Sequence, residues 1–214
     1  MVMVHRKYTL GEEIFNSVTH GVGALLAVAG CVVLIVMAAI SKGAIEVVSS
    51  AIYGSSLIIL YSMSTLYHAL TNNTAKKVFQ ILDHNTIFLL IAGTYTPLTL
   101  CSLGGALGWT IFGMVWGAAV VGIVFSSINL NKFRKFSTFC YIVMGWGIIF
   151  AIKPLYNSIS TLSLVMLVIG GVLYSLGVIF YVKKEYRYTH SVWHIFVLGG
   201  SIFHYFSILN AITI

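Results

Sequence analysis

Charged side chains are scarce in this sequence of 214 residues, of which only 8% are Asp, Glu, Lys or Arg. An average globular domain carries about a quarter charged residues. Hydrophobic residues make up 59% of the chain, and the shortage of charge extends over its whole length. A soluble domain of this size could not bury so much apolar surface. We therefore expect a membrane protein, for which lipid is the natural solvent.

Acidic residues and cysteines are also few. The chain has five acidic and 12 basic residues, for a net charge of +7. In a soluble protein this charge would suggest nucleic acid as a partner. Here the basic residues stand in short clusters between apolar runs, as in the loops of membrane proteins, so we expect no nucleic-acid partner. The three cysteines lie in or beside apolar runs without a CxxC pair, which argues against a disulfide framework or a thiolate metal site.

Seven apolar runs reach the length of about 18 residues that a membrane span needs. The simplest organisation is one domain, residues 1–214, folded as an all-α bundle of seven transmembrane helices. Residues 70–79 and 129–136 are expected to be connections. Pro97 is expected to kink the third run and Pro154 to end the fifth. The runs cover residues 18–40, 47–69, 80–101, 107–128, 137–153, 161–182 and 191–212.

The basic residues predict the orientation of the bundle. With seven alternating crossings, ten of the twelve fall on one side of the membrane, and the exceptions are Lys42 and Lys153. The positive-inside rule then places the N-terminus in the cytoplasm and the C-terminus on the extracytoplasmic side. The ten are Arg6, Lys7, Lys76, Lys77, Lys132, Arg134, Lys135, Lys183, Lys184 and Arg187.

Polar residues of four different runs fall on that same predicted cytoplasmic side. Nothing in the composition requires this convergence, so it predicts a functional site. A carboxylate within a membrane costs about 2.5–3.5 kcal/mol on insertion scales, so Asp83 needs a local partner. The residues are Glu13, Asn16 and His20, which precede or open the first run, Ser64 and His68, which close the second, Asp83 and His84, which open the third, and His190 and His194, which open the seventh.

The spacing of the histidines indicates a metal site. His190 and His194 stand four residues apart, so they share one face of a helix, and His68 can add a third nitrogen. Three imidazoles leave one position of a tetrahedral Zn²⁺ open, which is the pattern of catalytic zinc. Such an ion lowers the pKa of a bound water to about 7. Asp83 can then be a general base, a direct ligand or an outer group, and the sequence leaves these roles open.

A simpler interpretation stands beside this one. An HxxxH pair arises by chance, and histidines also make ordinary contacts between membrane helices. The addition of His68 and Asp83 on the same side favours a metal. The remaining polar residues are given supporting roles: Ser64 orients His68 or holds a water, His84 packs beside the site, His20, Asn16 and Glu13 hold helices together, His204 hydrogen-bonds inside the bundle, and Glu12 is a surface charge.

The ordered set of these segments resembles the hemolysin III family of bacterial membrane proteins. That family belongs to the progestin and adipoQ receptor superfamily, which includes the adiponectin receptors. The resemblance is carried by Glu13-Ile-Phe-Asn16-Ser-Val-Thr19-His20, Ser64-Thr-Leu-Tyr-His68, Leu82-Asp83-His84 and His190-Ser-Val-Trp-His194.

The resemblance implies a multi-pass protein of the bacterial plasma membrane with an intramembrane zinc near the cytoplasm. It implies His68, His190 and His194 as the zinc ligands. Asp83 would contact zinc through a water, and Ser64 would support the site. In the adiponectin receptors this site is associated with hydrolysis of the amide bond of ceramide.

Three functions follow as hypotheses. The first is a zinc-dependent hydrolase of a lipid amide or ester, with membrane lipids as its partners and a role in lipid homeostasis. The second is a non-enzymatic sensor or regulator of the membrane state, in which zinc is a structural staple. The third is a hemolysin-type cytolytic protein, which the lack of an amphipathic, pore-lining stripe disfavours.

Overall fold

A computed structural model describes residues 8–41, 43–183 and 186–213, and this part of the chain is helical throughout apart from short connections. Seven helical segments in it are long and apolar enough to cross a membrane, which confirms the predicted bundle. The elements are α1 (Leu10–Ser41), α2 (Ala44–Ala69), α3 (Asn73–Pro97), the π-helix η1 (Leu98–Leu103), α4 (Gly105–Ile128), α5 (Leu130–Trp146), the 3₁₀-helix η2 (Gly147–Ala151), α6 (Ile152–Ser158), α7 (Thr161–Val182) and α8 (Thr189–Thr213).

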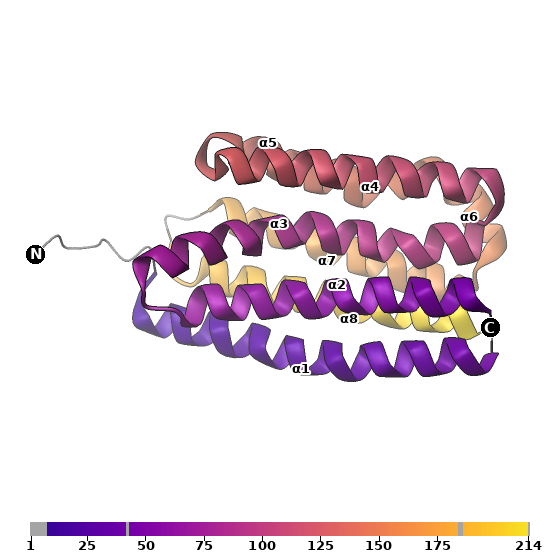
Figure 1. Ribbon diagram of the computed structural model, residues 1–214, viewed down its shortest axis with the longest axis horizontal. Helices are drawn as coiled ribbons and strands as arrows, with labels where there is room; N and C mark the ends of the chain where they lie inside the picture. The colour runs from indigo at the N-terminus through magenta and orange to yellow at the C-terminus, as the bar shows by residue number, and fades with distance from the viewer. Residues whose placement is uncertain (1–7, 42, 184–185, 214) are drawn as a thin grey trace, which may run out of the picture.

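The helices run side by side along the long axis of the molecule, and the two termini lie at opposite ends (Figure 1). The α2–α3, α4–α5 and α7–α8 connections lie at the end where α1 begins. We call this the basic end, because it carries Lys76, Lys77, Lys132, Arg134, Lys135, Lys183 and Arg187. Lys153 lies at the other end, and His5, Arg6, Lys7, Lys42 and Lys184 lie outside the described residues. Which end faces the cytoplasm stays a prediction.

The helices α1, α3 and α5 begin well before the apolar runs do, so the connections 70–79 and 129–136 are shorter than expected. The helix α3 begins at Asn73 because the Asn72 side chain accepts hydrogen bonds from the backbone N–H groups of Thr74 and Ala75. The helix α5 begins at Leu130, capped in the same way by Asn129. These caps satisfy N–H groups that a helix start leaves without partners. An apolar run marks only the part of a helix that lies within the hydrocarbon core, so it does not include a polar first turn.

The two prolines behave differently from each other. The α-helical part of the third span ends at Pro97, and the span continues as a π-helix to Leu103. Pro154 was expected to end the fifth span, and this prediction is wrong. Pro154 lies within α6, and the span continues to Ser158. Pro154 is the third residue of this short helix. Proline is tolerated in a first helical turn because its missing N–H would have no intrahelical acceptor there.

Close packing of α3 on α4 depends on a glycine. A Cβ added to Gly122 would collide with the ring of Phe88, which is fully buried. Gly117 lies on the same helix with nothing within 4 Å of its Cβ position. In lipid, where no water drives helices together, this kind of close approach is a main source of association energy.

We therefore expect Gly122→Ala to destabilise the protein and Gly117→Ala not to. Both changes gain about 1 kcal/mol of helix propensity. Only Gly122→Ala overpacks the α3–α4 contact, at about 1–3 kcal/mol. Thermal unfolding of the two purified variants in the same detergent measures the difference. Equal melting temperatures would show that the Gly122 contact does not hold these helices.

Candidate metal centre

Three histidines meet at the basic end, and we call them the histidine cluster: His68, His190 and His194. His68 closes α2, and the other two stand on the first turns of α8. Each is buried, and one nitrogen from each lies within 4.8 Å of the others. The Nε2 atoms of His190 and His194 are 3.1 Å apart. Tetrahedral zinc separates two nitrogen ligands by about 3.3 Å, given bonds of about 2.0–2.1 Å. The cluster can therefore hold a metal ion.

The orientation of the His68 ring fits this use. Its Nδ1 lies 2.6 Å from Oε2 of Glu13, so the ring N–H donates to the carboxylate. Neutral imidazole then presents a lone pair on Nε2. This Nε2 is buried and has no hydrogen-bond partner among the described residues. A carboxylate behind a histidine, fixing its tautomer, is the usual outer support of a metal ligand.

Glu13 is held in turn by Lys76. The Lys76 Nζ lies 2.9 Å from Oε1 of Glu13 and also donates to the backbone oxygens of Tyr67 and Leu70, at 2.9 and 3.3 Å. Both carboxylate oxygens are therefore hydrogen-bonded, and the ion pair is satisfied on both sides. The sequence identified Lys76 only as a topology signal, because no spacing pattern links it to Glu13 in another helix.

Glu12, next to Glu13 on α1, contacts the segment that precedes His190. It is buried rather than a surface charge, so that expectation is wrong. Its Oε1 accepts the backbone N–H of Tyr188 at 2.8 Å, and its Oε2 accepts from the N–H and hydroxyl of Thr9. Tyr188 has a positive φ of 61°, and it stands two residues before His190. Glu12 thus holds the backbone of Tyr188, just before His190.

Asn16 and His20 contact the first turns of α8. The Asn16 side chain is fully buried, and its Oδ1 accepts from the hydroxyl of Ser191 at 2.7 Å. The His20 ring stacks on the His194 ring, with centroids 3.6 Å apart and planes 17° apart. His20 does not belong to the histidine cluster. These contacts agree with a role in joining α1 to α8.

Tyr8 covers the cluster at the basic end. Its ring stacks on His190 at 4.9 Å and lies 5.6 Å from the ring of His68. The side chain is buried, and burial raises the pKa of the Tyr8 hydroxyl, so the phenol stays neutral near pH 7. This role of Tyr8 has no sequence signal, because a tyrosine before a span is also typical of an ordinary membrane interface.

Asp83 and His84 lie on α3 across from α8. His84 donates from Nδ1 to the backbone oxygen of Gln80 at 2.9 Å and accepts from the hydroxyl of Tyr181 at 3.2 Å. Asp83 is mostly buried, and its Oδ2 lies 3.6 Å from Nδ1 of His84. Neither residue belongs to the histidine cluster. The role of Asp83 towards a metal-bound water stays a prediction.

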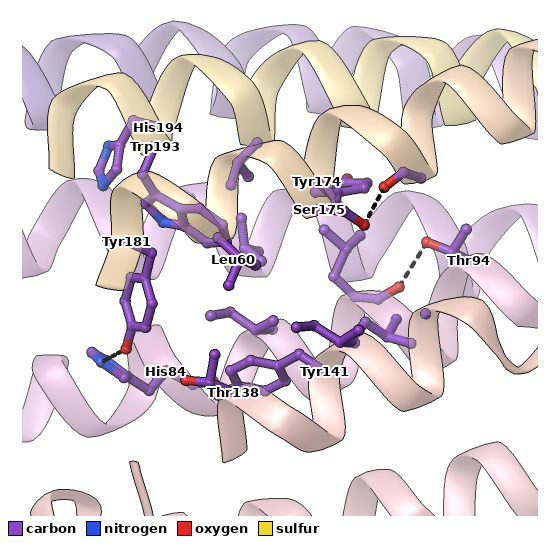
Figure 2. A pocket seen from close by; sticks show the side chains of 18 of the residues that line it. Leu60, His84, Thr94, Thr138, Tyr141, Tyr174, Ser175, Tyr181, Trp193 and His194 are labelled. Atoms are coloured by element: carbon purple, nitrogen blue, oxygen red, sulfur yellow. Dashed lines mark hydrogen bonds between the residues drawn. The ribbon is translucent and has the colours of Figure 1, made fainter. Parts of the chain in front are cut away.

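A cavity of about 130 Å³ extends from the cluster into the bundle. Figure 2 shows His194, Tyr181 and His84 towards one side of it and Tyr174 and Thr94 towards the other. The lining comes from α1, α2, α3, α5, α7 and α8 and is mainly apolar.

A few polar groups interrupt this apolar lining. Ser64 and Asp83 lie on it together with His190 and His194, and the buried Ser64 hydroxyl has no hydrogen-bond partner among the described residues. His204 also lines the cavity and contacts the Leu167 backbone oxygen through Nε2 at 3.1 Å, which confirms its expected hydrogen bond.

Known proteins match this chain over nearly its whole length. A family model described as "Haemolysin-III related" matches residues 8–205. "Hemolysin-3" of Bacillus cereus is 46% identical over 198 residues, which cover 92% of this chain and 90% of that protein. "Hemolysin-3 homolog" of Bacillus subtilis (strain 168) is 46% identical over 202 residues, covering 94% and 95%. The human "Monocyte to macrophage differentiation factor" is 29% identical over 209 residues, covering 94% and 85%.

The support of His68 by Glu13 generates a prediction. We expect Glu13→Gln to weaken metal binding by about 10–100-fold, because a neutral amide holds the ring orientation and basicity less well. Competition with a chromogenic chelator measures the affinity. Glu46→Gln, at the other end of the bundle, is the control and keeps the wild-type affinity. An unchanged affinity in Glu13→Gln would contradict the positioning role.

Proposed function

This chain belongs to the haemolysin-III related family, and from its histidine cluster we propose that it is a zinc-dependent hydrolase of a lipid amide or ester. It is a multi-pass cell-membrane protein. One observation carries the proposal: two of the three clustered histidines line a mainly apolar cavity, together with a carboxylate and a hydroxyl. Metal-ligand and proton-transfer groups thus share a space that suits an acyl chain.

Zinc is the metal that fits three neutral imidazoles and one open position best. When bound, it supplies an activated water and polarises a carbonyl. The residues of the chain have separate tasks. Glu13 keeps the Nε2 of His68 directed at the cluster, and Ser64 is placed to hold a water or a substrate oxygen. Asp83 is the proposed proton acceptor, which is the role of a general base.

The proposed substrate is a membrane lipid that enters from the side. Tyr8 covers the cluster at the basic end, whereas the cavity extends between α5 and α7 into the apolar part of the bundle. An acyl chain lying along this lining would place its polar linkage beside the cluster. The depth of the cluster near one end of the helices matches the depth of the linkage region of a lipid leaflet.

A structural staple is the alternative, and one observation favours it. His68 comes from α2, whereas His190 and His194 come from the last helix, so a shared ion would crosslink two distant parts of the chain. The two functions differ in what Asp83 does. A staple has no use for a proton acceptor, whereas hydrolysis has.

The metal itself is tested by elemental analysis. We expect about one zinc per purified chain, which is lost in His190→Ala because two imidazoles bind far more weakly than three. His204→Gln is the control. His204 lies about 15 Å farther along α8 than His194, so this variant should keep its zinc. Wild-type protein without zinc would contradict the proposal.

The chemistry is tested by Asp83→Asn. We expect this variant to keep its zinc and its melting temperature and to lose lipid turnover by at least 100-fold, the usual size of a general-base contribution. Mass spectrometry of a broad lipid mixture before and after incubation measures turnover. If wild-type protein binds zinc and hydrolyses no lipid, while loss of the metal lowers the melting temperature, the staple is correct.

A further inference from the structure

A second pocket lies behind His68, on the side away from the cavity described above. It has a volume of about 590 Å³ and is formed by the first turns of α1, the end of α2 and the beginning of α3. We call it the α1–α3 pocket. One wall is apolar and made by Leu10, Ile14 and Val18, which are spaced by four residues on α1 and are 62, 56 and 58% exposed.

The opposite wall is polar and positively charged. Thr71, Asn73 and Lys77 line it, and all three side chains are exposed. The acidic member of the lining, Glu13, accepts hydrogen bonds from both His68 and Lys76, so its charge is compensated locally. Lys77 forms no ion pair with any described residue. The pocket therefore keeps an unmatched positive charge.

We propose that the α1–α3 pocket binds the headgroup of an anionic phospholipid. The occupant has to be amphiphilic, because an exposed apolar wall faces a polar, basic one at the end of the helices. A lipid phosphate matches Lys77, and an acyl chain matches the face formed by Leu10, Ile14 and Val18. Basic pockets between membrane helices are known to hold anionic headgroups for these reasons.

This site is separate from the proposed hydrolysis. Its lining includes neither Asp83 nor the α8 histidines, and the cavity lining includes neither Lys77 nor Asn73. The two linings share no residue, and the α1–α3 pocket is connected to the histidine cluster through His68, which lines it together with Glu13 and Lys76. A headgroup there lies next to the ion pair that holds a cluster histidine, so its binding is coupled to the stability of the cluster.

The test uses the full chain in a neutral detergent, titrated with phosphatidylglycerol or phosphatidylcholine, with complexes counted by native mass spectrometry. We expect the wild type to prefer phosphatidylglycerol. Lys77→Gln should weaken phosphatidylglycerol binding about fivefold, which is the effect of one basic residue near an anionic surface. Asn73→Glu should weaken it at least as much, because it adds a negative charge to the pocket while favouring the start of α3.

Two substitutions on α5 serve as matched controls. Lys135→Gln and Asn131→Glu make the same changes at exposed positions of the same basic end, outside the pocket. Both should bind phosphatidylglycerol like the wild type, and so should Asp83→Asn, whatever its effect on turnover. Equal losses in pocket and control variants, or no preference over phosphatidylcholine, would overturn the proposal. Displacement of the lipid by inorganic phosphate would also overturn it, by assigning the pocket to free phosphate.

Discussion

The hydrogen bond between Nδ1 of His68 and the carboxylate of Glu13 is the contact from which the rest of the site is arranged. A carboxylate at this depth cannot rely on water, so it needs protein partners. Lys76 supplies the second one and also binds two backbone oxygens at the end of α2. One ion pair and one imidazole thereby fix the relative depth of α1, α2 and α3. Nε2 of His68 is left for the cluster because Nδ1 is already used.

The first helix supports both helices that carry the histidine cluster, and it does so with two faces. Glu13 faces α2 and α3, whereas residues spaced by four, Tyr8, Glu12, Asn16 and His20, face α8 and the loop before it. A spacing of four keeps side chains on one side of a helix. The last helix therefore meets Glu12, Asn16 and His20 in register along about two turns of α1, and Tyr8 extends this row just before the helix begins. The first and last helices, which are far apart in sequence, are thus joined beside the histidine cluster.

Much of this arrangement could be predicted from the sequence, because the membrane restricts the choices. Span length and the alternation of basic clusters predicted seven helices, and HxxxH spacing with His68 predicted the histidine cluster. Glu12 was misjudged because its partners, Thr9 and the backbone N–H of Tyr188, leave no periodic signal. Tyr8 and Lys76 were missed for a related reason. Their roles depend on how α1 and α3 are rotated, and near a membrane surface aromatic and basic residues are common anyway.

The position of His20 bears on whether the cluster acts as a staple or as a catalyst. A structural zinc site is normally closed by four protein ligands, whereas a catalytic site keeps one position open. His20 is the nearest additional imidazole in the described part of the chain, yet it lies flat against the His194 ring at 3.6 Å. A ring stacked in this way directs its nitrogens parallel to those of His194 and not across to a shared ion. The stacking thus keeps this imidazole from serving as a fourth ligand, so a metal held by the histidine cluster would keep a position for water or substrate. Ser64 and Asp83 line the cavity together with His190 and His194.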